Sequence, residues 1–149
     1  KQWGGEKYAL VAEEIVRTTG ATVLLFGAGA DVACGTRIAE AVPKGVVDLT
    51  GKTTIPQLIA LIHRCGLFVT NDTGPMHVAA AVGVPIVAIF GSTDVITTAP
   101  FTNDCIILKK EVECAPCLLR ACPIDHRCME RIAVEEVMEA VKRMLRGKR

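Results

Sequence analysis

The sequence predicts an α/β fold built on a doubly wound parallel sheet, and three observations support this prediction. Residues 21–26 and 85–90 are apolar runs without polar alternation, which is typical of parallel strands buried on both faces. Each run ends at a glycine-containing turn. Segments with helical spacing of apolar residues lie between such runs. Strands that alternate with helices along 149 residues predict one domain with about five parallel strands.

The predicted elements follow one another in near-regular order. In the first helix Tyr8, Val11 and Ile15 recur at a helical period, and Gly20 is typical of a residue that ends a helix. Residues 111–131 are predicted to be a cysteine-rich loop. Helices are expected at residues 6–19, 31–41, 55–65, 76–82 and 134–145, and strands at residues 21–26, 46–49, 67–69, 85–90 and 105–108.

Composition and charge exclude several classes of protein. Half of the residues are apolar and no long charge run occurs, so the chain can bury a core. The net charge is +1 and no basic stripe precedes the last residues, which argues against a nucleic-acid partner. No apolar run approaches the roughly 18 residues that span a bilayer, so neither a membrane span nor a signal peptide is predicted. Seven cysteines without secretory features predict reduced thiols in the cytoplasm.

The stretch from Phe68 to Asp94 carries the strongest functional signal. It predicts a strand, an NDTG turn, a helix, a second strand and a GSTD turn. Ligands of open α/β sheets bind outside the carboxyl ends of the strands, where both turns are expected. A helix that begins near Gly74 offers free N–H groups and a positive dipole end to an anion, and His77 adds a proton donor. The stretch therefore predicts a pocket for a phosphate or diphosphate with hydroxyl groups nearby.

This stretch resembles the donor-binding region of the bacterial lipopolysaccharide heptosyltransferases, in particular the second heptosyltransferase. The D-[ST]-G-x-x-H pattern, the G-x-P strand and the F-G-x-T turn carry the resemblance, and weaker matches extend through the whole chain. Asp72 would hold sugar hydroxyls, and Thr73, Gly74 and His77 would hold the diphosphate. In the GSTD turn, the hydroxyls of Ser92 and Thr93 are further candidate donors to sugar or phosphate.

The resemblance also implies contacts outside this stretch. Lys1, in a K-x-W start that includes Trp3, would contact the donor phosphates as a point charge. Asp31, where the family often has Glu, would accept hydrogen bonds from the ribose. Lys52 and Thr53 would lie near the base. Without the resemblance, Lys1 is an ordinary terminal lysine, and Trp3 is expected to pack in the core.

Two glycine motifs invite other interpretations. The string GAGADV at residues 27–32 follows a strand, and Asp48 lies about 20 residues on, as a nicotinamide-cofactor site would require. The third glycine of that fingerprint is missing, so an ordinary strand-to-helix turn is favoured. The string LTGKTT at residues 49–54 lacks the first glycine of a P-loop. There, Thr53 or Thr54 is expected to cap the next helix.

The cysteine-rich loop raises the question of a metal site. Cys114, Cys117, Cys122 and Cys128 could form a tetrahedral site, with His126 as a substitute ligand. The first C-x2-C fits a zinc knuckle, but the second spacing is loose. The heptosyltransferases often carry a similar cysteine-rich segment, and free structural thiols are the favoured interpretation. No metal ligand is therefore assigned.

Together these features predict that residues 1–149 form the single, Rossmann-like donor-binding half of a GT-B glycosyltransferase, with the N-terminal acceptor domain absent from this chain. The resemblance implies transfer of L-glycero-D-manno-heptose from ADP-heptose to the inner core of lipopolysaccharide. No cofactor is expected, because no D-x-D metal motif occurs. The alternatives are a glycosyltransferase for another sugar nucleotide, or a non-catalytic, metal-stabilised nucleotide-binding module.

The catalytic base is expected to lie outside this chain. Asp72 is better suited to donor hydroxyls and His77 to phosphate, so no catalytic residue is assigned here. The isolated chain is expected to bind the donor without transferring the sugar, because the acceptor would bind to the missing domain. The full-length protein is expected in the cytoplasm, with peripheral contact at the cytoplasmic face of the inner membrane.

Overall fold

The computed structural model describes residues 2–119 and 121–147, and the chain divides into two compact units. The small unit comprises residues 4–58, and the large unit comprises residues 1–3 and 59–149. The α/β class and the five parallel strands are as predicted, and their ladders form one sheet of two strands and one of three. In the described part of the chain, no helix is both long and apolar enough to cross a membrane.

The small unit is built from two parallel strands and their helices. Gly20 ends the first helix in the left-handed region at φ 69°, as its position in the sequence predicted. A Cβ atom on Gly35 of the second helix would lie 2.5 Å from Thr50 Oγ1, so only glycine allows this close approach to the turn after the second strand. The elements are α1 (Gly5–Thr19), β1 (Val23–Leu25), the 3₁₀ turn η1 (Gly29–Asp31), α2 (Val32–Ala41) and β2 (Val46–Asp48).

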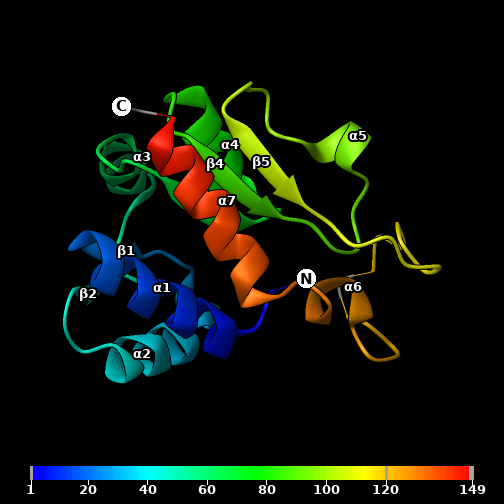
Figure 1. Ribbon diagram of the computed structural model, residues 1–149, viewed down its shortest axis with the longest axis horizontal. Helices are drawn as coiled ribbons and strands as arrows, with labels where there is room; N and C mark the ends of the chain where they lie inside the picture. Colours follow the sequence, from blue (N-terminus) through cyan, green and yellow to red (C-terminus); the bar gives the residue numbers. More distant parts are fainter. Residues whose placement is uncertain (1, 120, 148–149) are drawn as a thin grey trace. The chain divides into compact units, whose positions relative to one another are not determined.

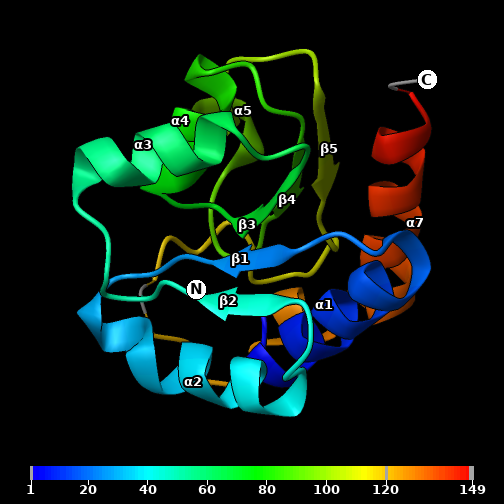
Figure 2. The same ribbon diagram turned by 90° about the vertical axis from the view of Figure 1, so that its left-hand side faces the viewer.

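The large unit is organised around its central strand, β4 (Ile86–Ile89), in which every residue is buried. It pairs in parallel with β3 (Phe68–Asn71) on one side and β5 (Cys105–Leu108) on the other. The helices α4 (Gly74–Ala81) and α7 (Val134–Arg146) contact opposite faces of this sheet (Figures 1 and 2). An uninterrupted apolar strand is therefore covered on both faces, as the sequence predicted.

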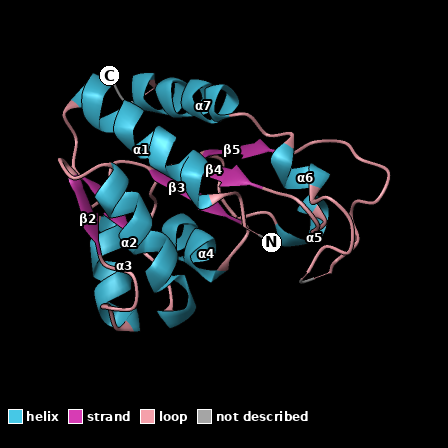
Figure 3. Cartoon of the chain, turned by 90° about the horizontal axis from the view of Figure 1, so that it is seen from below, coloured by secondary structure: helices cyan, strands magenta, loops and turns pink. Residues whose placement is uncertain are grey.

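The remaining helices are short or lie where the two units meet in the sequence. The helix α3 (Ile55–His63) begins with a reciprocal cap, because Thr54 N donates to Gln57 Oε1 at 2.9 Å and Gln57 N donates to Thr54 Oγ1 at 3.4 Å. This confirms the predicted threonine cap. The four-residue helices α5 (Val95–Thr98) and α6 (Arg127–Glu130) were not predicted. Figure 3 shows α6 beside the long loop that follows β5.

Trp3 ties the beginning of the described chain to two distant segments of the large unit. Its side chain is 1% exposed. Its indole Nε1 donates to Ile132 O at 2.9 Å, and its backbone N donates to Asn71 Oδ1 at 3.0 Å. The predicted packing role of Trp3 is thus confirmed, and the indole N–H has the partner that a buried tryptophan requires.

Truncation of Trp3 is expected to destabilise the large unit strongly. Trp3→Ala should lower the free energy of unfolding by about 3–5 kcal/mol, because a large buried side chain is replaced by a cavity. Trp3→Phe should cost less, because the ring volume is partly kept while the bond to Ile132 is lost. Urea unfolding followed by circular dichroism measures both. The control Ile96→Ala, at a side chain 92% exposed, should stay within about 0.5 kcal/mol of the parent. A Trp3→Ala value near that of the control would contradict the assignment.

The turn after β2 contains an internally bonded carboxylate. Thr50 donates to Asp48 Oδ1 from both Oγ1, at 2.6 Å, and the backbone N, at 2.9 Å. The Thr50 side-chain bond is the main reason that the pKa of Asp48 lies below its usual range. Lys52 Nζ, 3.8 Å from Asp48 Oδ2, adds a smaller effect in the same direction. Ionised Asp48 therefore stabilises the small unit.

Thr50→Val should make the small unit less stable near neutral pH. The loss should be about 1 kcal/mol at pH 7, because one hydrogen bond to a carboxylate disappears. A folded-state pKa below the unfolded value gives stability that is present above the unfolded pKa and is lost as pH falls through the folded pKa. The difference between Thr50→Val and the parent should therefore shrink below about pH 4. Urea unfolding at pH 7 and pH 3 measures this, with the exposed Thr36→Val as control. A difference that does not depend on pH would refute the role of Asp48.

Candidate functional site

The NDTG turn leaves the N-terminus of α4 without a side-chain cap. Thr73 occupies the cap position in an extended conformation, but its hydroxyl makes no capping bond. Thr73 Oγ1 instead lies 3.3 Å from Thr70 Oγ1 and 3.4 Å from Asn71 O. Thr73 is of a residue type that often caps helices, but its side chain does not cap this one. Because the Thr73 side chain makes no capping bond, the positive end of α4 remains suited to an anion.

Asp72, Thr73, Gly74 and His77 lie together around this helix end, as the sequence predicted. Gly74 and His77 are exposed, whereas Asp72 is half-buried. A Cβ atom on Gly74 would meet no other atom within 4 Å. The packing of the chain itself therefore does not require a glycine at this position. Close approach of a ligand would explain it.

The GSTD turn lies at the same edge of the sheet, because Asn71 of β3 is in register with Ile89 of β4. Ser92 is buried, and its Oγ donates to Leu119 O at 3.3 Å. Leu118 N donates to Ser92 O at 2.8 Å. Sequence analysis missed this contribution of residues 118–119, because backbone groups of any residue type can make such bonds.

The other two members of the GSTD turn differ in how their side chains are satisfied. Thr93 is buried, and its Oγ1 has no hydrogen-bond partner among the described residues. Asp94 caps α5, since its Oδ1 accepts from Ile96 N at 3.0 Å. Of the two hydroxyls that the sequence proposed for a ligand, that of Ser92 is thus bonded within the chain and that of Thr93 is not.

The small unit contains a second group of predicted ligand-contacting residues. The turns after β1 and β2 lie against each other, as Gly51 N donates to Gly27 O at 2.9 Å. Asp31 Oδ2 accepts from Ala28 N at 2.8 Å, and Lys52 Nζ donates to Asp48 O at 2.8 Å. Both charged groups are thus bonded within their own turns.

Three further residues of the sequence predictions are Thr53, Lys1 and Asp48. Thr53 is half-buried in the same turn as Lys52, and Lys1 lies outside the described residues. Asp48, the acidic residue of the alternative nicotinamide site, is bonded to Thr50. The nicotinamide interpretation therefore gains no support from its position.

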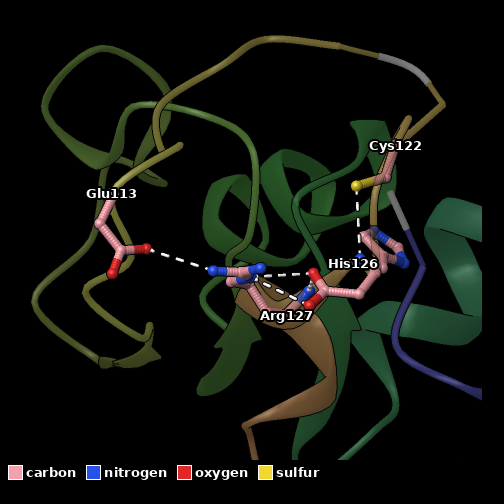
Figure 4. A network of polar contacts seen from close by, with 5 residues as sticks. Glu113, Cys122, His126 and Arg127 are labelled. Carbon is pink, nitrogen blue, oxygen red and sulfur yellow. Dashed lines mark hydrogen bonds and ion pairs between the residues drawn. The ribbon is translucent and has the colours of Figure 1, made fainter.

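The loop after β5 is held by one arginine (Figure 4). Arg127 Nε donates to the two carboxylate oxygens of Asp125 at 2.9 and 3.1 Å, and Arg127 also donates to Glu113 Oε2 at 3.5 Å. The hydrogen bond to Asp125 is the main reason that the pKa of Arg127 is raised. His126 N donates to Cys122 Sγ at 3.3 Å, as drawn in the same figure. Arg127 therefore joins two segments of the loop through carboxylates.

The four cysteines of this loop are all free thiols. Cys128 is buried, and burial raises its pKa, with a smaller effect from the neighbouring Cys114, Cys122 and Cys117. No group of three His, Cys, Asp or Glu side chains within residues 2–119 and 121–147 is arranged to hold a metal ion. The structure therefore does not assemble the metal site that the spacing of these cysteines raised as an alternative.

The chain is similar in sequence and in fold to known glycosyltransferases. Residues 1–127 match the sequence model of glycosyltransferase family 9 (heptosyltransferase). Lipooligosaccharide heptosyltransferase 2 of Campylobacter jejuni is 36% identical over 99% of this chain and 47% of its own length. The solved structure of ADP-heptose LPS heptosyltransferase II from E. coli superposes with a TM-score of 0.86 at 28% identity, over 99% of this chain and 43% of that protein.

A second solved structure, a family 9 glycosyltransferase from Veillonella parvula, is 30% identical, with a TM-score of 0.85 over 99% of this chain and 42% of that protein. The chain thus spans less than half the length of these relatives. The similarity in sequence and in fold confirms the resemblance that the NDTG and GSTD turns indicated. The chain belongs to glycosyltransferase family 9, the heptosyltransferase family.

Proposed function

We propose that this chain binds the sugar-nucleotide donor ADP-heptose and acts as the donor half of a heptosyltransferase. The observation that carries the proposal is the uncapped N-terminus of α4, with exposed Gly74 and His77 at the edge of the sheet where β3 ends. The E. coli relative at 28% identity is named for ADP-heptose, which supports the choice of donor.

The chemistry of this arrangement suits a diphosphate leaving group. Negative charge grows on ADP as the bond to the sugar breaks, and donors fixed at that place stabilise it. The backbone N–H groups at Thr73 and Gly74, the imidazole of His77 and the ammonium of Lys1 would supply these donors. The carboxylate of Asp72 would accept hydrogen bonds from sugar hydroxyls. On this proposal the groups would act without a metal ion.

Residues of the small unit would recognise the nucleoside. Asp31 would accept hydrogen bonds from the ribose, and Lys52 and Thr53 would contact the base. Because Asp31 and Lys52 are bonded to Ala28 and Asp48 without a ligand, each would exchange an internal bond for a ligand bond. Net affinity should therefore depend more on the α4 terminus than on these charges.

The remaining parts of the reaction are assigned to the portion of the relatives that this chain does not match. That portion would bind the inner core of lipopolysaccharide, supply the catalytic base and bring the protein to the cytoplasmic face of the inner membrane. Residues 1–149 would thus form one donor-binding domain that does not transfer heptose alone. Alignment of both substrates, worth roughly 7–11 kcal/mol, would require the other half.

Nucleotide selectivity tests the proposal directly. The chain should bind ADP and ADP-heptose more tightly than UDP or NADH, because the diphosphate, ribose and base contacts are all proposed for this half. Isothermal titration calorimetry gives the affinities, and amide shifts in NMR spectra should change at residues 27–31 and 71–77. If NADH and ADP-heptose bind equally well, or if the shifts lie elsewhere, the proposal is wrong.

Two substitutions at the α4 terminus test the anion site. Gly74→Ala should leave the melting temperature nearly unchanged, because the new methyl group meets no other atom within 4 Å, and should weaken ADP binding by obstructing the phosphate. His77→Ala should cost about 1.5–3 kcal/mol in ADP affinity if a charged imidazole bonds to phosphate.

The matched control is His63→Ala, at an exposed histidine on α3 whose Nδ1 lies 3.4 Å from Val82 O. ADP affinity should be unchanged in this variant. Unchanged ADP affinity in His77→Ala would remove His77 from the proposed site.

A further inference from the structure

The hydroxyl of Thr93 stands apart from the other buried polar groups. Thr93 is 5% exposed, and within the described residues its Oγ1 is the buried side-chain polar atom that has no hydrogen-bond partner. A buried hydroxyl without a partner destabilises a fold, and valine of the same shape would avoid that cost. A buried hydroxyl that lacks a partner therefore needs an explanation other than the stability of the fold.

The position of Thr93 suggests the reason. It follows β4 at the edge of the sheet where the NDTG turn follows β3, and these two strands are adjacent and in register. Ligands of open parallel sheets bind at this edge. An oxygen atom of such a ligand is therefore a suitable partner for the hydroxyl.

Residues of the loop after β5 cover the turn that contains Thr93. Leu118 N donates to Ser92 O at 2.8 Å, and Ser92 Oγ donates to Leu119 O at 3.3 Å. At the start of the same turn, a Cβ atom on Gly91 would lie 2.9 Å from Met129 Cε. Gly91 and Ser92, the two residues that precede Thr93, are thus both close to the segment that follows β5.

The part of this cover around Leu118 is weakly held. Leu118 adopts φ 59°, a left-handed conformation that is unfavourable for a leucine. Its side chain is 63% exposed and that of Leu119 is 48% exposed, so neither is anchored in the core. Backbone strain and poor burial both reduce the cost of moving this segment away from Ser92.

We infer that Leu118 and Leu119 form a movable cover over the GSTD turn and that Thr93 Oγ1 is a ligand-contacting group. Release of Ser92 by the cover exposes the hydroxyl, which then donates to an oxygen atom of the donor. This inference rests on the proposed function, because the ligand is the bound sugar nucleotide. The oxygen belongs to either the diphosphate or the sugar, and the two can be separated by experiment.

Thr93→Val separates a ligand role from a structural role. Without ligand, the variant should melt at the same temperature as the parent or higher, because it removes an unpaired buried hydroxyl. Its donor affinity should fall about five- to tenfold, as expected for one lost hydrogen bond. Thr93→Ser, which keeps the hydroxyl, should keep most of the affinity.

The choice of ligand identifies the contacted oxygen. Equal losses for ADP and ADP-heptose indicate the diphosphate, and a loss for ADP-heptose alone indicates the sugar. Unchanged affinity for both, or a lower melting temperature of Thr93→Val, would overturn the inference while leaving the proposed function intact. Failure of the parent chain to bind either ligand would overturn both.

Hydrogen exchange tests the cover. Saturating ADP-heptose should speed exchange at the Leu118 amide, because its bond to Ser92 O is released. The Phe90 amide, which donates to Leu108 O at 2.9 Å within the sheet, is the internal control and should not change in this way. Equal or slower exchange at Leu118 with ligand would show that the segment does not open.

Discussion

The parallel pairing of β4 with β3 and β5 is the constraint on which the candidate site depends. Every residue of β4 is buried, and its ladders to β3 and β5 define one register for the three strands. The fixed register brings the ends of β3 and β4 to one edge of the sheet. The NDTG and GSTD turns are adjacent for this reason. The pairing of these apolar strands thus brings the polar residues of two separate turns to one edge of the sheet.

The sequence predicted those parts of the fold that depend on local pattern. β4 and β5 were found because uninterrupted apolar runs have few alternatives, and the start of α4 was found because Gly74 and Pro75 suit a first helical turn. The helices α5 and α6 have four residues each, too few to display a helical period. The partners of Ser92 lie 26 and 27 positions away and are backbone groups, so side-chain identity contained no signal for them.

The polar groups of the candidate site differ in how free they are to meet a ligand. Asp31 and Lys52 already have partners in their own turns, whereas Gly74 and His77 are exposed at a helix end that no side chain caps. Thr93 is a third case, because its hydroxyl is buried and has no partner in the part of the chain that the structure describes. On the proposed function, the helix end would therefore bind an anion without prior rearrangement.

The placement of Trp3 has a practical consequence for optical spectroscopy. The chain contains one tryptophan and one tyrosine. Trp3 is buried in the large unit, whereas Tyr8 belongs to the small unit, where burial raises the pKa of its phenol. Tryptophan emission therefore reports on one unit, and the alkaline absorbance change of tyrosinate reports on the other. The two units carry distinct natural chromophores, so cooperative or stepwise melting can be distinguished without any label.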